Sequence, residues 1–319
     1  MNFEMIKAAA GRLDGHARQT PILSSPFLDE IAGRKLMVKP ECLQRTGSFK
    51  FRGAWSAISA LSPETRARGV IAFSSGNHAQ GIALAAREHA IPAVIVMPND
   101  APALKIANTK GYGAEVVLYD RPGGESREAV GEALARERGL TLIKPFDEPL
   151  VIAGQGTVGL EIAEQSQDGD VLVCCGGGGL TAGIALALAE TAPKMRVRPV
   201  EPVGFDDMAR SMISGVIEKN DTGTGNICDA ILTPQPGEIT FPIIQRLCGP
   251  GLVVTEQEAC RAMVLAWQHL KVVAEPGGAV ALAAALFHAD KVEGPTVTAV
   301  VSGGNVDPTL FAETLQRYG

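Results

Sequence analysis

Short runs of apolar, β-branched residues alternate along this chain with longer, alanine-rich segments whose apolar residues recur at helical spacing. A strand followed by a helix, repeated many times, is typical of βαβ units, which build parallel sheets with helices on both faces. We therefore predict an α/β protein with two doubly wound domains and parallel-rich sheets. The expected strands are residues 69–73, 93–97, 114–118, 170–174, 196–201 and 296–301. The expected helices are residues 77–87, 101–110, 124–138, 180–189, 256–269 and 277–289.

A break between the two domains is expected where Pro145 and Pro149 bracket acidic residues. We expect a smaller domain over residues 69–142. It would be inserted into a larger domain formed by residues 1–68 and 143–319.

Composition and charge narrow the class of protein. The 319 residues are 46% hydrophobic and 20% charged, which is enough apolar material for a sizeable core. No apolar run approaches the roughly 20 residues that span a bilayer, and the first residues lack a signal-peptide pattern. We therefore expect a cytoplasmic protein with no membrane contact. The net charge of −6 and the lack of a basic block argue against a nucleic-acid partner. The six cysteines contain no CxxC pair, so neither a disulfide framework nor a zinc site is expected.

Three strand-to-helix turns carry unusual chemistry, at the sheet edge where ligands of such folds bind. The turn SSGNH, residues 74–78, would offer free N–H groups and the positive end of a helix dipole to a carboxylate or phosphate. The four glycines 176–179 would form a backbone cradle for phosphate. The turn SGGN, residues 302–305, would hold a hydroxyl at a strand end.

A lysine completes this set of candidates. Lys50 lies in the stretch TGSFKFRGA, residues 46–54, at the expected start of a helix with glycines on either side. On its own each feature has an ordinary interpretation: a helix cap at 74–78, a flexible linker at 176–179, a simple turn at 302–305 and a solvated lysine. Together they suit an aldehyde cofactor that carries a phosphate, with an amino-acid substrate. Lysine forms Schiff bases with such carbonyls.

A nucleotide-binding protein without lyase activity is an open alternative. The glycines also fit a loose GxGxxA pattern from Gly177 to Ala182. Glu201 ends the next expected strand about 20 residues further on, where a dinucleotide site places its ribose-binding acid.

The chain resembles the serine/threonine dehydratase and serine racemase family, pyridoxal-phosphate enzymes of the tryptophan-synthase-β-like fold. The resemblance covers nearly the whole chain, and its motifs occur in the family's order. The matching segments are residues 47–54, 74–80, 153–157, 176–179, 275–276 and 302–307.

The resemblance implies a role for each matched residue. The larger domain would bind the cofactor and the smaller one the substrate. Lys50 would hold the cofactor covalently and then act as the base at Cα, Phe49 would pack on the cofactor ring, and Asn77 would hydrogen-bond its 3′ oxygen. The cofactor phosphate would bind to Gly176, Gly177, Gly178 and Gly179. The substrate carboxylate would lie among Ser74, Ser75, Asn77 and His78, largely on backbone N–H groups.

Ser302 would face the pyridine nitrogen, and this determines the expected reaction. A serine cannot keep a proton on that nitrogen as a carboxylate can, so the ring would be a weaker electron sink. Transamination would be suppressed, while elimination of a β-hydroxyl stays accessible. The substrate amine would displace Lys50, and Lys50 would remove the α-proton. The hydroxyl would leave as water, protonated by the cofactor phosphate. The released enamine would hydrolyse to a keto acid and ammonia.

A divalent cation is also implied by the resemblance to serine racemase-like members. Glu201 and Asp207 would supply carboxylates and Phe205 a backbone carbonyl. An all-oxygen set favours Mg²⁺ or Ca²⁺. The alternative is an acidic helix start that complements the helix dipole.

The substrate and the balance of activities stay open. Ser75, where plain threonine dehydratases have alanine, could return a proton to the opposite face of Cα and permit racemisation. Phe146 matches the dehydratases instead. Arg127 could bind a second carboxylate through a bidentate fork, although it could equally be an exposed helix arginine. The candidates are therefore an ammonia-lyase for L-threonine, L-serine or 3-hydroxyaspartate, and a serine or aspartate-type racemase with dehydratase side activity. The resemblance also implies a homodimer.

Overall fold

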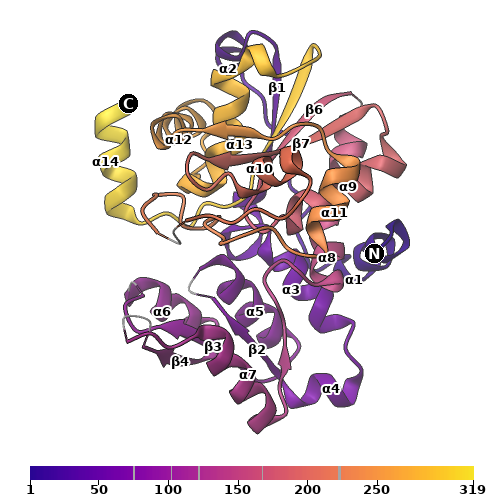
Figure 1. Ribbon diagram of the computed structural model, residues 1–319, viewed down its shortest axis with the longest axis vertical. Coiled ribbons are helices and arrows are strands. Elements are labelled where there is room, and N and C mark those ends of the chain that lie inside the picture. The colour runs from indigo at the N-terminus through magenta and orange to yellow at the C-terminus, as the bar shows by residue number, and fades with distance from the viewer. Residues whose placement is uncertain (75, 102, 121–122, 167, 222–223) are drawn as a thin grey trace.

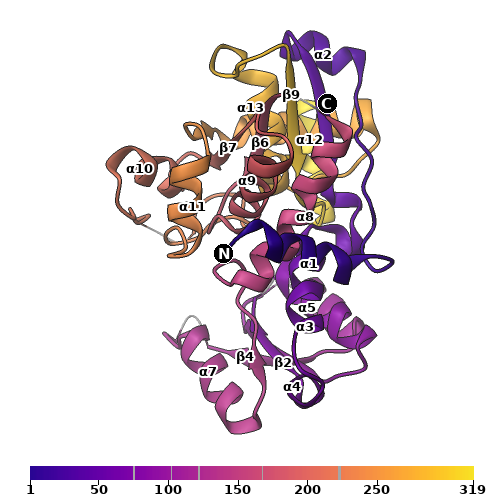
Figure 2. The ribbon, with the colours of Figure 1, turned by 90° about the vertical axis from the view of Figure 1, so that its right-hand side faces the viewer.

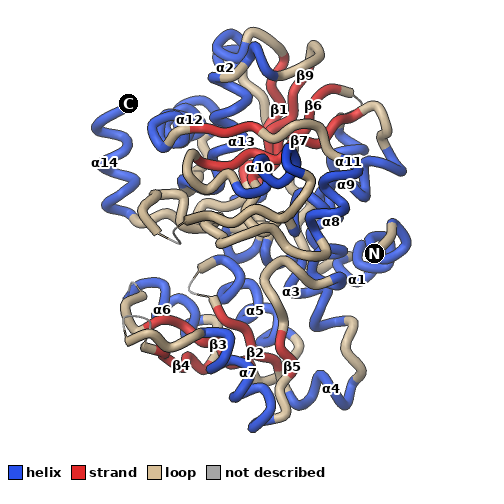
Figure 3. The backbone as a smooth tube through the Cα atoms, viewed as in Figure 1, coloured by secondary structure: helices blue, strands red, loops and turns tan. Residues whose placement is uncertain are grey.

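The computed structural model describes residues 1–74, 76–101, 103–120, 123–166, 168–221 and 224–319. It has two lobes, each built on its own sheet (Figures 1 and 3). The five-stranded sheet has the order β1-β9-β6-β7-β8 and the four-stranded sheet the order β4-β3-β2-β5. Neighbouring strands pair parallel throughout both. The strands are β1 (Lys35–Pro40), β2 (Val70–Phe73), β3 (Ala93–Pro98), β4 (Glu115–Tyr119), β5 (Thr141–Leu142), β6 (Gly169–Cys174), β7 (Met195–Pro202), β8 (Leu252–Val254) and β9 (Thr296–Val301).

The predicted α/β class with parallel sheets is confirmed, and each expected strand is present within a residue or two of its predicted ends. Three strands were not predicted. β5 and β8 are two and three residues long, too short to show a period, and β1 carries two lysines within six residues. The strands of the smaller sheet all lie within residues 69–142, but the division into domains at those boundaries stays a prediction.

Helices cover both faces of each sheet, because central parallel strands are apolar on both sides. In β6, Val171 and Val173 pack against α8 and α9, while Leu172 and Cys174 face α13. The smaller sheet lies between α5 on one face and α7 on the other. The helices are α1 (Phe3–Leu13), α2 (Pro26–Ala32), α3 (Lys50–Ser59), α4 (Pro63–Arg68), α5 (Asn77–Glu88), α6 (Ala103–Gly111), α7 (Arg127–Arg138), α8 (Pro149–Gln165), α9 (Gly179–Thr191), α10 (Asp207–Ser214), α11 (Thr240–Leu247), α12 (Glu256–Leu270), α13 (Pro276–Phe287) and α14 (Pro308–Tyr318).

In the described part of the chain, no helix combines the length and the apolar composition that crossing a bilayer requires.

Helix α3 joins the two lobes. It packs on α5 of the smaller lobe and on α8 of the larger one, with α1 beside it at the waist (Figures 1 and 2). Arg52 on α3 is buried and forms ion pairs with Glu41 at 2.7 Å and with Glu161 of α8 at 2.6 Å. The buried Lys39 of β1 shares Glu161 at 2.6 Å. These charges hold α3 to the larger sheet and its covering helix.

Glycines allow α8 and α9 to approach closely. A methyl group added at Gly183 of α9 would lie 2.6 Å from the carbonyl oxygen of Ile152 and 2.7 Å from the nitrogen of Gly156, both on α8. Backbone atoms cannot retreat as a flexible side chain can, so this contact requires glycine.

Gly183→Ala is therefore expected to destabilise the protein by about 1–3 kcal/mol through overpacking. The matched control is Gly11→Ala at an exposed position of α1, where an added methyl group meets nothing within 4 Å. It should raise stability by about 0.5–1 kcal/mol. Denaturant unfolding of both variants measures the two shifts. Equal midpoints for Gly183→Ala and the wild type would contradict the close contact.

Candidate active site

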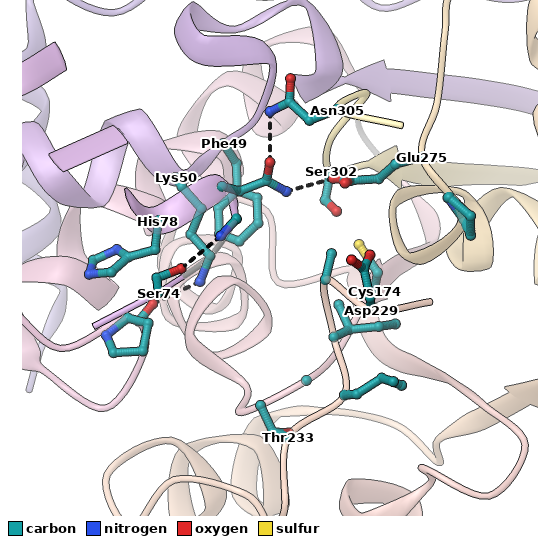
Figure 4. A pocket seen from close by; sticks show the side chains of 18 of the residues that line it. Phe49, Lys50, Ser74, His78, Cys174, Asp229, Thr233, Glu275, Ser302 and Asn305 are labelled. Atoms are coloured by element: carbon teal, nitrogen blue, oxygen red, sulfur yellow. Dashed lines mark hydrogen bonds between the residues drawn. The ribbon is translucent and has the colours of Figure 1, made fainter. Parts of the chain in front are cut away.

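The turns predicted to share one ligand line one cavity of about 620 Å³. Residues from the 74–78 turn, from 176–179 and from 302–305 contribute to it, together with Phe49 and Lys50 (Figure 4). They meet because β2, β6 and β9 end at this cavity, and β6 and β9 are neighbours in one parallel sheet.

Lys50 is the first residue of α3, and its amine reaches into the cavity. Its Nζ donates a hydrogen bond to the carbonyl oxygen of Pro145 at 2.8 Å and lies 5.0 Å from the centre of the Phe49 ring. Burial disfavours the ammonium form and lowers the pKa of Lys50 to about 8. An uncharged amine is a nucleophile and a base, so this lysine can do both kinds of chemistry.

The lysine segment is bound directly to the segment that carries Ser302. The backbone N–H of Phe49 donates to the carbonyl oxygen of Ser302 at 3.0 Å. The N–H of Gly304 donates to the carbonyl oxygen of Gly47 at 2.9 Å. Ser302 is 4% exposed at the end of β9, and the distance from Lys50 to this hydroxyl is thus set by the backbone.

The glycine loop has the form of an anion cradle. It precedes α9, whose N-terminus offers unpaired N–H groups, and Gly178 has φ +89°, which favours glycine. Side chains at any of the four positions would collide with neighbours: Gly176 with the Ile231 backbone, Gly177 with the Phe146 ring, Gly178 with Thr240 and Gly179 with Gln155. The residues present therefore fit a phosphate group.

The turn after β2 lines another part of the same cavity. Ser74 accepts a hydrogen bond from the N–H of Gly76 at 3.2 Å through its hydroxyl oxygen. The Nε2–H of His78 donates to the carbonyl oxygen of Ile143 at 3.0 Å, and burial lowers the pKa of His78 to about 3. His78 is therefore neutral, and its ring is engaged with the backbone. Ser75 lies outside the described residues.

Two residues without a predicted role also line the cavity. Glu275 accepts a hydrogen bond from Asn77 at 2.6 Å, and Asn305 donates one to Asn77 at 2.7 Å (Figure 4). Burial raises the pKa of Glu275 to about 7. Both lie in segments that match the family, residues 275–276 and 302–307. A glutamate directly before a proline that starts a helix is the sequence feature from which Glu275 could have been predicted.

The mouth of the cavity carries further charges. Arg127 begins α7, with its guanidinium 5.6 Å from the centre of the Phe73 ring and its Nε donating to Glu128 at 2.7 Å. Its side chain is 46% exposed, which suits a group that meets a ligand from solution. Lys105 of α6 pairs with Asp229 at 2.6 Å, an ion pair between the two lobes that was not predicted.

The three predicted cation ligands lie apart from this cavity, at the end of β7 and the start of α10. Glu201 accepts the N–H groups of Met208 and Ala209 at 2.9 and 2.8 Å, so it caps α10. Asp207 accepts from Asn220 at 2.6 Å, while its buried Oδ2 has no protein partner among the described residues. Burial raises the pKa of both carboxyl groups, that of Asp207 to about 6.

Within the described ranges, no cluster of three His, Cys, Asp or Glu side chains could hold a metal ion. The expected set, two carboxylates and the carbonyl of Phe205, contains only two such side chains. The orphaned oxygen of Asp207 fits a cation there.

Comparisons with known proteins give the family. A model of the pyridoxal-phosphate dependent enzymes matches residues 13–303. An L-threo-3-hydroxyaspartate ammonia-lyase from Pseudomonas sp is 46% identical over 314 residues, covering 98% of each chain. A serine racemase from Dictyostelium discoideum is 40% identical over 314 residues, covering 97% of this chain and 96% of that one.

A solved structure agrees. Serine racemase from maize has a TM-score of 0.92 and 38% identity, covering 99% of this chain and 97% of that one. The resemblance inferred from the motifs is confirmed. Since the match covers most of the 319 residues and the glycine cradle fits a phosphate, this chain belongs to the pyridoxal-phosphate dependent enzymes.

Proposed function

We propose that this protein is a pyridoxal-phosphate dependent ammonia-lyase that removes water from a β-hydroxy amino acid and yields a 2-keto acid and ammonia. The water lost in the elimination is regained when the enamine product hydrolyses. The convergence of Lys50 with Ser302 supports this proposal most directly. A buried amine of lowered pKa and a neutral hydroxyl at a strand end meet in one cavity. Relatives named ammonia-lyases at 40–46% identity support it as well.

The cofactor, when bound, supplies an electron-withdrawing ring that weakens the bonds at Cα of an attached amino acid. In our proposal Gly176–Gly179 hold its phosphate through backbone N–H groups and Phe49 packs on its ring. Lys50 accepts the α-proton at Nζ. The 74–78 turn holds the α-carboxylate, largely through backbone N–H groups and the dipole of α5.

Ser302 decides between reaction types in this scheme. Its hydroxyl is too weak an acid to keep the pyridine nitrogen protonated, so negative charge at Cα is not stored for long. A leaving group at Cβ removes that charge at once. Elimination is therefore favoured over transamination.

The substrate we favour is L-threo-3-hydroxyaspartate. Arg127 lies at the cavity, where its planar fork could bind a second carboxylate that serine and threonine lack. A relative that bears this substrate in its name has 46% identity.

A racemase is the second candidate. Serine racemases at 40% identity favour it, and so does the residue type at Ser75, whose role stays a prediction. A homodimer and a cytoplasmic location also stay predictions. The exposed apolar side chains of Phe27 on α2 and Trp267 on α12 are the kind of surface that a second copy would cover.

The lowered pKa of Lys50 can be measured in the apoenzyme. Because burial disfavours the ammonium form, acylation of Lys50 by an amine reagent should rise with pH around a midpoint of about 8. In the denatured chain the midpoint should return to about 10.4. Mass spectrometry of the Lys50 peptide gives both curves, and identical midpoints would contradict the burial of this amine.

Substrate preference is tested by comparing kcat/KM for L-threo-3-hydroxyaspartate, L-threonine and L-serine, with keto acid and D-amino acid both measured. Hydroxyaspartate should be the best substrate. Arg127→Ala should lower its kcat/KM by roughly tenfold to a hundredfold, the worth of a charge-assisted hydrogen bond, and leave L-serine nearly unchanged. Arg127→Lys, which keeps the charge and loses the fork, should fall between.

The control is Arg136→Ala, on the exposed side of the same helix. Lys50→Ala should abolish keto acid formation from every substrate. Full turnover in Lys50→Ala would refute the lyase proposal, and a predominant D-product would replace it with the racemase. An equal loss for serine and hydroxyaspartate in Arg127→Ala would refute only the role of Arg127.

We further propose that Mg²⁺ or Ca²⁺ binds at Glu201, Asp207 and the carbonyl of Phe205. Supplying either ion to chelator-treated protein should raise the thermal midpoint. At an ion concentration of one hundred times the Kd, the free energy of unfolding should rise by about 2.7 kcal/mol. Asp207→Asn should remove the response. Asp206→Asn, which deletes a neighbouring negative charge, should retain it. If the thermal midpoint of the wild type is the same with and without either ion, the proposed cation site is refuted.

A further inference from the structure

Three side chains form a hydrogen-bonded row along one wall of the cavity. Asn305 Nδ2 donates to the backbone carbonyl oxygen of Thr46 and to Asn77 Oδ1, both at 2.7 Å. Asn77 Nδ2 then donates to Glu275 Oε1 at 2.6 Å. In Figure 4, dashed lines that end on Asn305 and on Glu275 mark their two bonds with Asn77. The row joins α5, the 302–305 turn and the residue before α13.

The direction of every bond in this row is determined at its two ends. A backbone carbonyl can only accept, so Asn305 must present its NH₂ group to Thr46 and to Asn77. Since Asn77 accepts from Asn305 through Oδ1, it presents its NH₂ group to Glu275, whose Oε1 accepts the bond. If the Asn77 amide were reversed, its oxygen would face the Glu275 carboxylate and its NH₂ group would face that of Asn305. Both contacts would be repulsive, so one orientation is selected.

Two glycines make room for the row. A side chain at Gly303 would collide with Glu275 Oε1 and would lie 3.2 Å from Asn77 Nδ2. A side chain at Gly47, whose φ is +73°, would lie 2.6 Å from Asn305 Oδ1. The row thus accounts for a glycine in the lysine motif and another in the serine motif. Neither belongs to the phosphate cradle.

Because its orientation is fixed, the Asn77 amide has one N–H that neither Glu275 nor Asn305 uses. Asn77 uses one hydrogen of its NH₂ group on Glu275 and its oxygen on Asn305, so the second hydrogen is what it can offer a ligand in the cavity. A reversed amide would offer a lone pair there. An anionic oxygen of a ligand is attracted by the first arrangement and repelled by the second.

We propose that Glu275 and Asn305 are positioning residues that hold Asn77 as a hydrogen-bond donor toward the 3′ oxygen of pyridoxal phosphate. This inference rests on the proposed function, since it takes Asn77 to contact that oxygen. Glu275 and Asn305 act only through Asn77. What matters about Glu275 is that it accepts a hydrogen bond, so its negative charge is dispensable.

The test uses two isosteric variants and one that removes the acceptor. Glu275→Gln can still accept from Asn77 through its amide oxygen, so it should bind the cofactor like the wild type. Glu275→Leu removes the acceptor, and Asn305→Asp replaces the donor by an acceptor that faces Asn77 Oδ1. In both, pyridoxal phosphate should dissociate faster, by roughly tenfold to a hundredfold, the equivalent of one charge-assisted bond. The visible absorbance band of the bound cofactor should shift as well.

The readouts are the cofactor dissociation rate and the absorbance spectrum of each holoenzyme, with the thermal midpoint of each apoenzyme recorded alongside. The matched control is Glu148→Leu, since burial also raises the pKa of Glu148 to about 7 but Glu148 does not line the cavity. It should leave the dissociation rate and the spectrum unchanged.

The outcomes separate this inference from the function on which it rests. If the wild type takes up no pyridoxal phosphate, the proposed function fails. If the wild type binds it while Glu275→Leu and Asn305→Asp release it at the wild-type rate, the positioning role fails and the function stands. Release by Glu275→Gln as fast as by Glu275→Leu would show that charge is required, and would overturn the orientation argument.

Discussion

The ion pairs of Arg52 are the interaction on which the geometry of the site depends. A guanidinium with almost no exposure is tolerated only because Glu41 and Glu161 neutralise it at close range. Removing one member of such a group leaves a buried charge without a partner, which is strongly unfavourable. Arg52 lies two residues after Lys50 on the same helix. The charges that hold α3 between the lobes therefore also determine where the reactive amine lies.

The parallel pairing of the strands brings the remaining segments of the site together. Strands that run in one direction bring their carboxyl ends to one edge, so turns far apart in the chain meet without any long connection. Short turns follow three of these strands, at residues 74–78, 176–179 and 302–305. Backbone hydrogen bonds from Phe49 to Ser302 and from Gly304 to Gly47 then join the lysine segment to that edge. Main-chain hydrogen bonds therefore set the spacing between the lysine segment and Ser302.

The sequence predicted the parts of the site that have a local signature. Turn residues after an apolar run, four consecutive glycines and a lysine between glycines can each be recognised within ten residues. The partners of Asn77 cannot, because Glu275 and Asn305 are 198 and 228 positions away and their direction depends on packing. The same holds for Lys105 and Asp229. Strands β5 and β8 were not predicted, because a strand of two or three residues is too short to show an alternating pattern. Glu201 also has the position of a ribose-binding acid in the sequence, but in the structure its carboxylate accepts hydrogen bonds from the first turn of α10.

The hydrogen bond from Lys50 to Pro145 has a consequence for the protein before it acquires its cofactor. An amine with a pKa of about 8 is uncharged often enough near neutral pH to react with any aldehyde that reaches it. Such an adduct would block the enzyme without giving it a ring or a phosphate. The bond to Pro145 uses an N–H of the amine, so it fixes where the nitrogen lies in the cavity of about 620 Å³ and leaves its lone pair free to react. An aldehyde that also carries a phosphate would gain a second attachment at the glycine cradle, which a small aldehyde lacks.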